Sequence, residues 1–216
     1  GLEGLRAQAA RAAAAYDPQA HDYAERQVFW QAMETALEAL SAYIRRHAAL
    51  ARERATSAAP QRARELSQVE TICTWIADRP PRTFWEALQL VWFVHLGIKM
   101  DDGGVGHSFG RFDQYLYPYY AAGIRTGKLT IDEAKELLAL FWIKLNREGD
   151  DIAHLSLGGQ TQTGENATNA LSHLCLQVDR WVSRKQPNLS TRVHTGTPDP
   201  YWQEIARTMR RGAYIV

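Results

Sequence analysis

The segment Thr83–Ile98 reads TFWEALQLVWFVHLGI, and this stretch decides which kind of fold the chain can adopt. It opens with a capping box, in which the Thr83 hydroxyl accepts from the third backbone N–H and the Glu86 side chain reaches back. Apolar residues then occupy nearly the whole circumference of the predicted helix: Leu88, Leu90, Val91, Trp92, Phe93, Val94 and Leu96. A helix that is apolar on all sides has to be covered on all sides. Because the neighbouring segments are mostly amphipathic, the stretch predicts a fold larger than this chain builds alone.

Upstream of this stretch, the sequence predicts further helices. The alanine-rich stretch Ala9–Ala15 favours a short amphipathic helix, with a transit peptide as the alternative. The pair Asp17-Pro18 is typical of a helix start, with Asp as N-cap and Pro at the first helical position. An apolar stripe at steps of three and four then predicts one long helix to about Ala55: Phe29, Met33, Leu37, Leu40 and Ile44. Pro60 begins another helix, which Pro80-Pro81 ends.

Downstream, four more helices are predicted from local signals. The aromatic run Phe112–Tyr120 favours a helix as far as Pro118. Thr130–Glu133 is a second capping box and predicts a helix behind it. Asn166 is expected to cap a further helix, and Asp199-Pro200 is expected to open the last one.

Two segments have the pattern of short strands. They are Ile152–Leu157, which Gly158-Gly159 closes, and Asn188–His194. Two or three isolated strands between helices leave unpaired edges and do not make a stable sheet. The residues therefore predict an α/β class, as a mostly helical segment of a larger domain.

Composition and charge exclude several classes of protein. The 216 residues are 45% hydrophobic and 23% charged, which is typical of a globular chain. Lys and Arg number 25 against 24 Asp and Glu, so the net charge of +1 provides no field for nucleic acid or an anionic membrane. No apolar run approaches the about 20 residues that a membrane-spanning helix needs. Only two cysteines are present, which favours a reducing, cytoplasmic location.

Few residues are candidates for chemistry. Cys73 and Cys175 lie mid-helix among apolar neighbours, where a thiol behaves as a small core side chain. The histidines have no second ligand at zinc-type spacing, so no metal site is predicted. The glycines of Gly103–Gly106 lack the spacing of a phosphate loop. The arginines between residues 45 and 64 are interleaved with glutamates and predict solvated helix faces.

Gly106-His107-Ser108 is the one place where polar groups gather in a glycine-rich, non-helical stretch. Neighbouring side chains of an extended segment point to opposite faces, so His107 and Ser108 cannot form a nucleophile–base pair with each other. They could instead line a pocket, as hydrogen-bond donors and acceptors to a small polar substrate.

Six stretches together resemble the glycyl radical enzymes, the family of pyruvate formate-lyase and its dehydratase relatives. They occur in the family's order and cover most of the chain from Gly1 to about Gly212. They are Pro81–Gln89 (PRTFWEALQ), His107–Tyr120 (HSFGRFDQYLYPYY), Trp142–Lys144 (WIK), Gly158–Gln160 (GGQ), Asn166–Asn169 (NATN) and Pro187–His194 (PNLSTRVH).

The resemblance implies a fold, a large α/β barrel of two antiparallel half-barrels that has ten strands in the family. This chain would supply outer helices and only a few barrel strands. Residues 1–216 would then be a partial pyruvate formate-lyase-type domain, truncated at both ends.

The resemblance also implies a radical chemistry. In the family, a radical on a backbone glycine passes to a cysteine, and the thiyl removes a hydrogen atom from the substrate. No segment here matches the Gly-Cys-Val-Glu or Arg-Val-x-Gly loops, which would lie beyond Val216. We therefore expect no catalytic residue, bound cofactor or metal in this chain, and a protein-based glycyl radical outside it. The expected partners are a small-molecule substrate, a radical-SAM activating enzyme and a second copy of the full-length protein, but neither nucleic acid nor membrane.

His107 and Ser108 match the His-Ser of the Gly-His-Ser motif that faces substrate hydroxyls in the dehydratase branch. The resemblance assigns both to substrate binding and favours a lyase or dehydratase, while Arg111, Asp113 and Gln114 are expected to be structural. A formate acetyltransferase-type enzyme is one alternative. A non-catalytic helical scaffold that binds a partner through exposed apolar surface is another, and a small nucleic-acid-binding regulator is a third.

Overall fold

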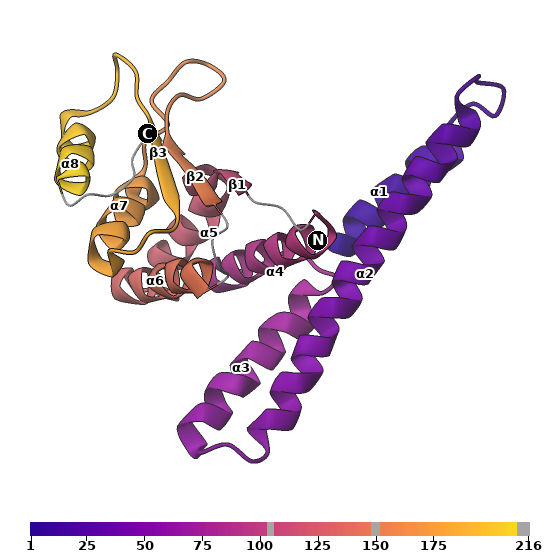
Figure 1. The fold of residues 1–216 in the computed structure, drawn as a ribbon, viewed down its shortest axis with the longest axis horizontal. Helices are drawn as coiled ribbons and strands as arrows, with labels where there is room; N and C mark the ends of the chain where they lie inside the picture. The colour runs from indigo at the N-terminus through magenta and orange to yellow at the C-terminus, as the bar shows by residue number, and fades with distance from the viewer. Residues whose placement is uncertain (103–105, 148–151, 211–216) are drawn as a thin grey trace. The chain divides into compact units, whose positions relative to one another are not determined.

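The computed structural model describes residues 1–102, 106–147 and 152–210. Within these ranges the chain forms eight helices and three strands, so the predicted mostly helical α/β class is confirmed (Figure 1). The chain divides into two compact units, which are described separately below. The first unit contains Gly1–Arg82 and Gln89–Gly97, and the second contains Thr83–Leu88 and Ile98–Val216.

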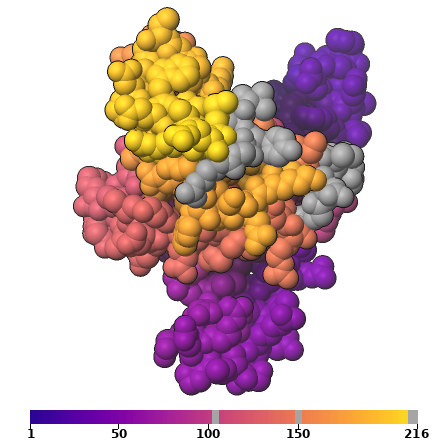
Figure 2. Space-filling view, turned by 60° about the vertical axis from the view of Figure 1, so that its left-hand side comes forward, coloured from indigo at the N-terminus to yellow at the C-terminus, as the bar shows by residue number. Residues whose placement is uncertain are grey.

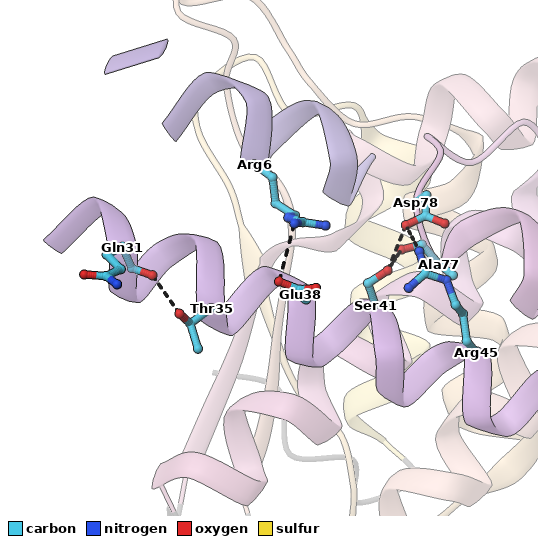
Figure 3. Close-up of polar contacts among 8 residues, drawn as sticks. All are labelled: Arg6, Gln31, Thr35, Glu38, Ser41, Arg45, Ala77 and Asp78. Carbon is cyan, nitrogen blue, oxygen red and sulfur yellow. Dashed lines mark hydrogen bonds and ion pairs between the residues drawn. The ribbon is translucent and has the colours of Figure 1, made fainter. Parts of the chain in front are cut away.

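The first unit is built around a long helix, α2 (Tyr23–Ala55), which packs against α1 (Leu2–Ala15) and α3 (Pro60–Ile76) (Figure 1). The proline at the start of α3 confirms the helix start predicted there. Polar contacts fasten α2 to the end of α3: the Ser41 hydroxyl lies 2.7 Å from the Ala77 carbonyl and 2.8 Å from the Asp78 carboxylate (Figure 3). Arg45 adds an ion pair of 2.6 Å to the same carboxylate.

The predicted start of α2 at Asp17-Pro18 is wrong. The Asp17 carboxylate accepts from the backbone N–H of Gln19 at 2.9 Å, so its side chain closes a local turn. The helix begins at Tyr23, with Asp22 in the N-cap position. Asp followed by Pro is compatible with both a turn and a helix start, and here the turn is formed.

The apolar helix α4 (Phe84–Asp102) is partly covered by the chain itself. Trp92 and Phe93 are only 8% and 3% exposed, and the Phe93 ring lies 6.0 Å from Tyr43 and 5.2 Å from His47 of α2. For these two residues, the expectation that only a larger fold could cover them is wrong. Three other apolar side chains of α4 remain between 37% and 62% exposed: Val94, Ile98 and Met100.

The second unit contains a parallel sheet in the order β1 (Gly106–Arg111), β2 (Ile152–Gly158) and β3 (Asn188–Arg192). The two predicted strands are confirmed, but they are not isolated, because β2 pairs with β3 and also with β1. Parallel neighbours need crossover connections, and helices provide them here. The sequence indicates an extended, non-helical stretch at residues 106–108 but not a paired strand, because the glycines and polar residues of β1 lack an apolar alternation.

The crossover helices are α5 (Phe112–Arg125) and α6 (Ile131–Arg147) between β1 and β2, and α7 (Ala170–Val182) between β2 and β3 (Figure 1). Helix α5 contains Pro118, so the prediction that the helix stops there is wrong. The second half of α5 is stabilised by packing, since Tyr120 is buried and its ring lies 5.8 Å from Phe84. The predicted capping box of α6 is confirmed: Thr130 Oγ1 accepts from the backbone N–H of Glu133 at 3.1 Å, and the Glu133 carboxylate accepts from the backbone N–H of Thr130 at 2.7 Å.

The last helix, α8 (Asp199–Met209), begins at the predicted Asp199-Pro200 and packs on α7. Figure 2 shows the yellow surface of α8 beside the orange surface of the segment that includes α7. Arg180 of α7 forms a 2.6 Å ion pair with Glu204 of α8 and donates to the Thr208 hydroxyl at 2.8 Å.

A buried carboxylate connects the elements of the second unit. Asp113, directly after β1, accepts from the Gly158 backbone N–H at 2.7 Å and from the Ser172 hydroxyl. Asn169 donates to the Asp113 carbonyl at 3.2 Å and caps α7 by accepting from the backbone N–H of Leu171 at 2.9 Å. These bonds hold the end of β2 and the start of α7 against the start of α5.

The predicted cap of α7 at Asn166 is therefore wrong by three residues. Asn166 pairs with Gln160 in an isolated antiparallel bridge, and its side chain accepts from the Thr168 backbone N–H at 3.3 Å. Asn169 is the N-cap because its carboxamide bonds the first turn of α7, while Ser172 returns the capping contact to its backbone N–H.

Replacing Asp113 should destabilise the protein strongly. In Asp113→Ala, the buried Gly158 N–H and the Ser172 hydroxyl lose their acceptor, and we expect a loss of about 3 kcal/mol in the free energy of unfolding. Chemical denaturation measures the loss. Glu136→Ala on α6 removes an exposed carboxylate as a control and should change this free energy by less than about 0.5 kcal/mol. Equal effects of the two substitutions would contradict the role of Asp113.

Asp179 should make stability depend on pH. Its buried carboxylate accepts from the Trp142 indole N–H at 3.1 Å, and burial raises its pKa from 3.8 to about 6. Between these two values the unfolded chain releases a proton that the folded chain retains, so the wild type loses stability as the pH rises from 4 to 6. Asp179→Asn keeps an acceptor for Trp142 and cannot titrate. From pH 4 to 7, the variant should therefore gain about 2 kcal/mol of unfolding free energy relative to wild type, and a constant difference would contradict this assignment.

Candidate functional site

The candidate site is built on strand β1, whose side chains alternate between the two faces of the sheet. His107 pairs in register with Ala153 of β2, and Ser108 pairs with His154. Ala153 is buried, as are Leu155 and Leu157 farther along β2, whereas His154 is half-buried. His107 therefore shares the apolar, buried face of the sheet, and Ser108 shares the more open, polar face. The predicted opposite orientation of the two side chains follows from this register.

The polar face brings together three side chains from three strands. The Ser108 hydroxyl of β1 lies 3.3 Å from His154 Nδ1, and His154 Nε2 lies 2.6 Å from the Ser190 hydroxyl of β3. Ser108 is exposed, and His154 and Ser190 are half-buried. The imidazole thus bridges the two hydroxyls across the middle strand, and the Ser108 hydroxyl also accepts from the Gly110 backbone N–H at 3.2 Å.

His107 occupies a different environment from Ser108. It is half-buried, and both of its ring nitrogens are shielded from solvent. The structure therefore places the two predicted substrate-binding residues next to each other along the chain but directs their side chains to separate faces.

The sequence does not single out His154 or Ser190, since each is one residue of a predicted strand and no local pattern connects the two strands. Ser108 and His154 are 46 residues apart in the chain, and His154 and Ser190 are 36 residues apart. The parallel pairing of β1, β2 and β3 brings the three side chains together. The register of these strands becomes visible only when they are paired.

Three polar residues after Ser108 are structural, as predicted. Arg111 donates to the Gly158 carbonyl at 2.8 Å, Gln114 donates to the Ala167 carbonyl at 2.8 Å, and Asp113 accepts from Gly158 and Ser172. Burial raises the pKa of the Asp113 carboxyl, although its hydrogen bonds oppose this shift.

A polar pocket of about 330 Å³ lies at the carboxyl ends of the strands. It is lined by Arg111, Gln160, Arg192 and His194, together with backbone and side chains of their neighbours. Gly159 lies in the left-handed region with φ +88°, and a Cβ there would approach the Arg192 side chain to 3.1 Å. Neither His107 nor Ser108 lines this pocket.

The described residues do not form a reactive cysteine or a metal site. Cys73 and Cys175 are buried, and burial raises the pKa of the Cys175 thiol well above its usual value, which keeps it protonated and unreactive. Among the described residues, no three His, Cys, Asp or Glu side chains are grouped so as to hold a metal ion. None of the helices in the described ranges has the length and apolar character needed to span a bilayer.

Comparison with known proteins identifies the family. The family model described as "Pyruvate formate lyase-like" matches residues 1–216. Isethionate sulfite-lyase of Nitratidesulfovibrio vulgaris is 33% identical over 99% of this chain and 28% of its own length. The (2S)-3-sulfopropanediol dehydratase of Klebsiella oxytoca is 35% identical over 82% of this chain and 23% of its own length.

A solved structure gives the same result for the fold. The glycerol-bound B12-independent glycerol dehydratase from Clostridium butyricum superposes with a TM-score of 0.90, at 30% identity, over 98% of this chain and 28% of that one. The chain thus spans less than a third of the length of each of these proteins. The pairing of helices with a short parallel sheet is therefore that of part of a glycyl radical enzyme barrel. The chain belongs to the pyruvate formate lyase-like family of glycyl radical enzymes.

Proposed function

We propose that the protein to which this chain belongs is a lyase or dehydratase that acts on a small, hydroxyl-bearing substrate. The observation that carries the proposal is the polar face of the parallel sheet, where the exposed Ser108 hydroxyl stands beside His154 and Ser190. Parallel sheets are normally covered on both faces, so a face lined with hydroxyl and imidazole groups suits a polar ligand. The relatives support the same class, since their names include a sulfite-lyase and dehydratases.

In this proposal, residues 1–216 form part of one pyruvate formate lyase-type domain and contribute binding groups. A thiyl radical would abstract the hydrogen atom; it would form on a cysteine by transfer from a glycyl radical, and both of these residues would lie outside this chain. The buried Cys73 and Cys175 take no part, because neither thiol can reach a substrate. A radical-SAM enzyme would generate the radical, and the full-length protein would work as a cytoplasmic homodimer.

His107 and Ser108 have separate tasks in this proposal. Ser108 projects from the polar face and would hydrogen-bond a substrate hydroxyl directly. His107 lies on the opposite, buried face of the same strand, so in this proposal it packs behind Ser108 and helps to hold β1 in place.

The activity is tested on the full-length protein after anaerobic activation. We expect an electron paramagnetic resonance signal of a glycyl radical and turnover of at least one hydroxylated compound: glycerol, propane-1,2-diol, isethionate or (2S)-3-sulfopropanediol. Turnover of pyruvate and coenzyme A alone would show a formate acetyltransferase-type enzyme instead. A protein that forms no radical would be a scaffold, and the proposal would fall.

The binding role of Ser108 is tested with the substrate identified in that panel. Ser108→Ala should lower kcat/KM by about tenfold or more, because it removes a hydrogen bond to the substrate. Ser67→Ala, at an exposed position of α3, is the matched control and should leave kcat/KM unchanged. If Ser108→Ala matched this control, Ser108 would not be a binding residue.

A further inference from the structure

Ser108, His154 and Ser190 form a hydrogen-bonded row across the strands β1, β2 and β3. The strand register alone does not predict this row, because it does not place all three residues directly opposite one another. The register aligns Ser108 with His154, and His154 with Asn188, two residues before Ser190. On one face of a sheet, positions two residues apart along a strand are diagonal neighbours within reach of a long side chain. The imidazole of His154 is long enough to contact both hydroxyls, at 3.3 Å on one side and 2.6 Å on the other.

The protons of this row can be counted. A neutral imidazole carries one N–H and one acceptor nitrogen, and a hydroxyl donates one hydrogen bond. When His154 carries its proton on Nδ1, it donates to Ser108, and the Ser190 hydroxyl donates to Nε2. When the proton is on Nε2, His154 donates to Ser190, and the Ser108 hydroxyl donates to Nδ1.

The two arrangements give Ser108 opposite properties. In the first, Ser108 Oγ accepts from His154 and from the Gly110 N–H at 3.2 Å, so its own proton is available to a ligand. In the second, the Ser108 proton is used by His154, and only an acceptor site of Oγ remains for a ligand. The tautomer of His154 therefore decides whether the open face offers a donor or an acceptor at Ser108.

We propose that His154 is a positioning residue, which sets the hydrogen-bonding sense of Ser108 and is itself held by Ser190. A substrate hydroxyl is both donor and acceptor, so it can bind Ser108 in either arrangement, whereas an oxyanion can bind only in the first. The row thus favours an alcohol group at Ser108 over an oxyanion of the substrate. This proposal rests on the proposed function for its ligand.

The first experiment measures ligand affinity on the full-length protein before activation, so that radical chemistry is absent. The probe is the panel compound that the activated protein converts, titrated by calorimetry. His154→Phe keeps a ring of similar size but removes both nitrogens, and it should weaken binding by about tenfold or more. The side-chain amide of His154→Gln offers an NH2 donor group and a carbonyl acceptor that can bridge the two hydroxyls, so binding should stay within about threefold of wild type.

Two further variants test whether Ser190 affects ligand binding through His154 or only stabilises the sheet. Ser190→Ala should weaken binding by about threefold in the wild type and have no effect in the His154→Phe background, because Ser190 acts only through His154. Ser67→Ala, at the exposed position of α3 already used as a control, should change affinity by less than about twofold.

The outcomes distinguish this inference from the proposed function. If the wild type converts and binds a hydroxylated compound but His154→Phe binds it equally well, the inference is overturned and the function stands. Equal losses in His154→Phe and His154→Gln would show a packing role and would also overturn the inference. If the wild type converts and binds none of the compounds, the function fails, and the inference fails with it.

Discussion

The second unit depends on one buried carboxylate. Asp113 follows β1 directly and accepts from the backbone at the end of β2 and from the first turn of α7, so a single side chain fixes three elements. Removing a carboxylate from water is costly, and its hydrogen bonds offset that cost only when these elements are in place. The same contact holds β1 beside β2, which is the register that aligns Ser108 with His154.

Local chemistry in the sequence predicts much of the helical part. The capping boxes at Thr83 and Thr130 identify their helices because every interacting group lies within one turn. Asn166 and Asn169 have the same side chain three residues apart, and the choice between them is made by Asp113, which is more than 50 residues away in the chain. Local signals cannot contain that information. Similarly, Phe93 is covered by Tyr43 and His47, contacts that the pattern of α4 alone does not reveal.

In the candidate site, too, the sequence predicts one part and only the tertiary structure reveals the other. Ser108 was predictable, because a glycine-rich polar segment stands out among apolar helices and matches a family motif. His154 and Ser190 were not, because each is an ordinary residue of a short strand until three strands are aligned. Sheet register depends on pairing across long loops, and a shift of one residue would turn His154 to the buried face. The chemistry of this face is therefore a property of the tertiary structure.

The three strands lie side by side in the order in which they occur along the chain, and each crossover returns to the edge of the strand just before it. A protein made from its N-terminus on the ribosome would present β1 first, then β2, then β3. β2 and β3 would each meet a finished neighbour on emerging, without waiting for a distant segment. Such an arrangement allows the wall of a large barrel to be assembled progressively during translation.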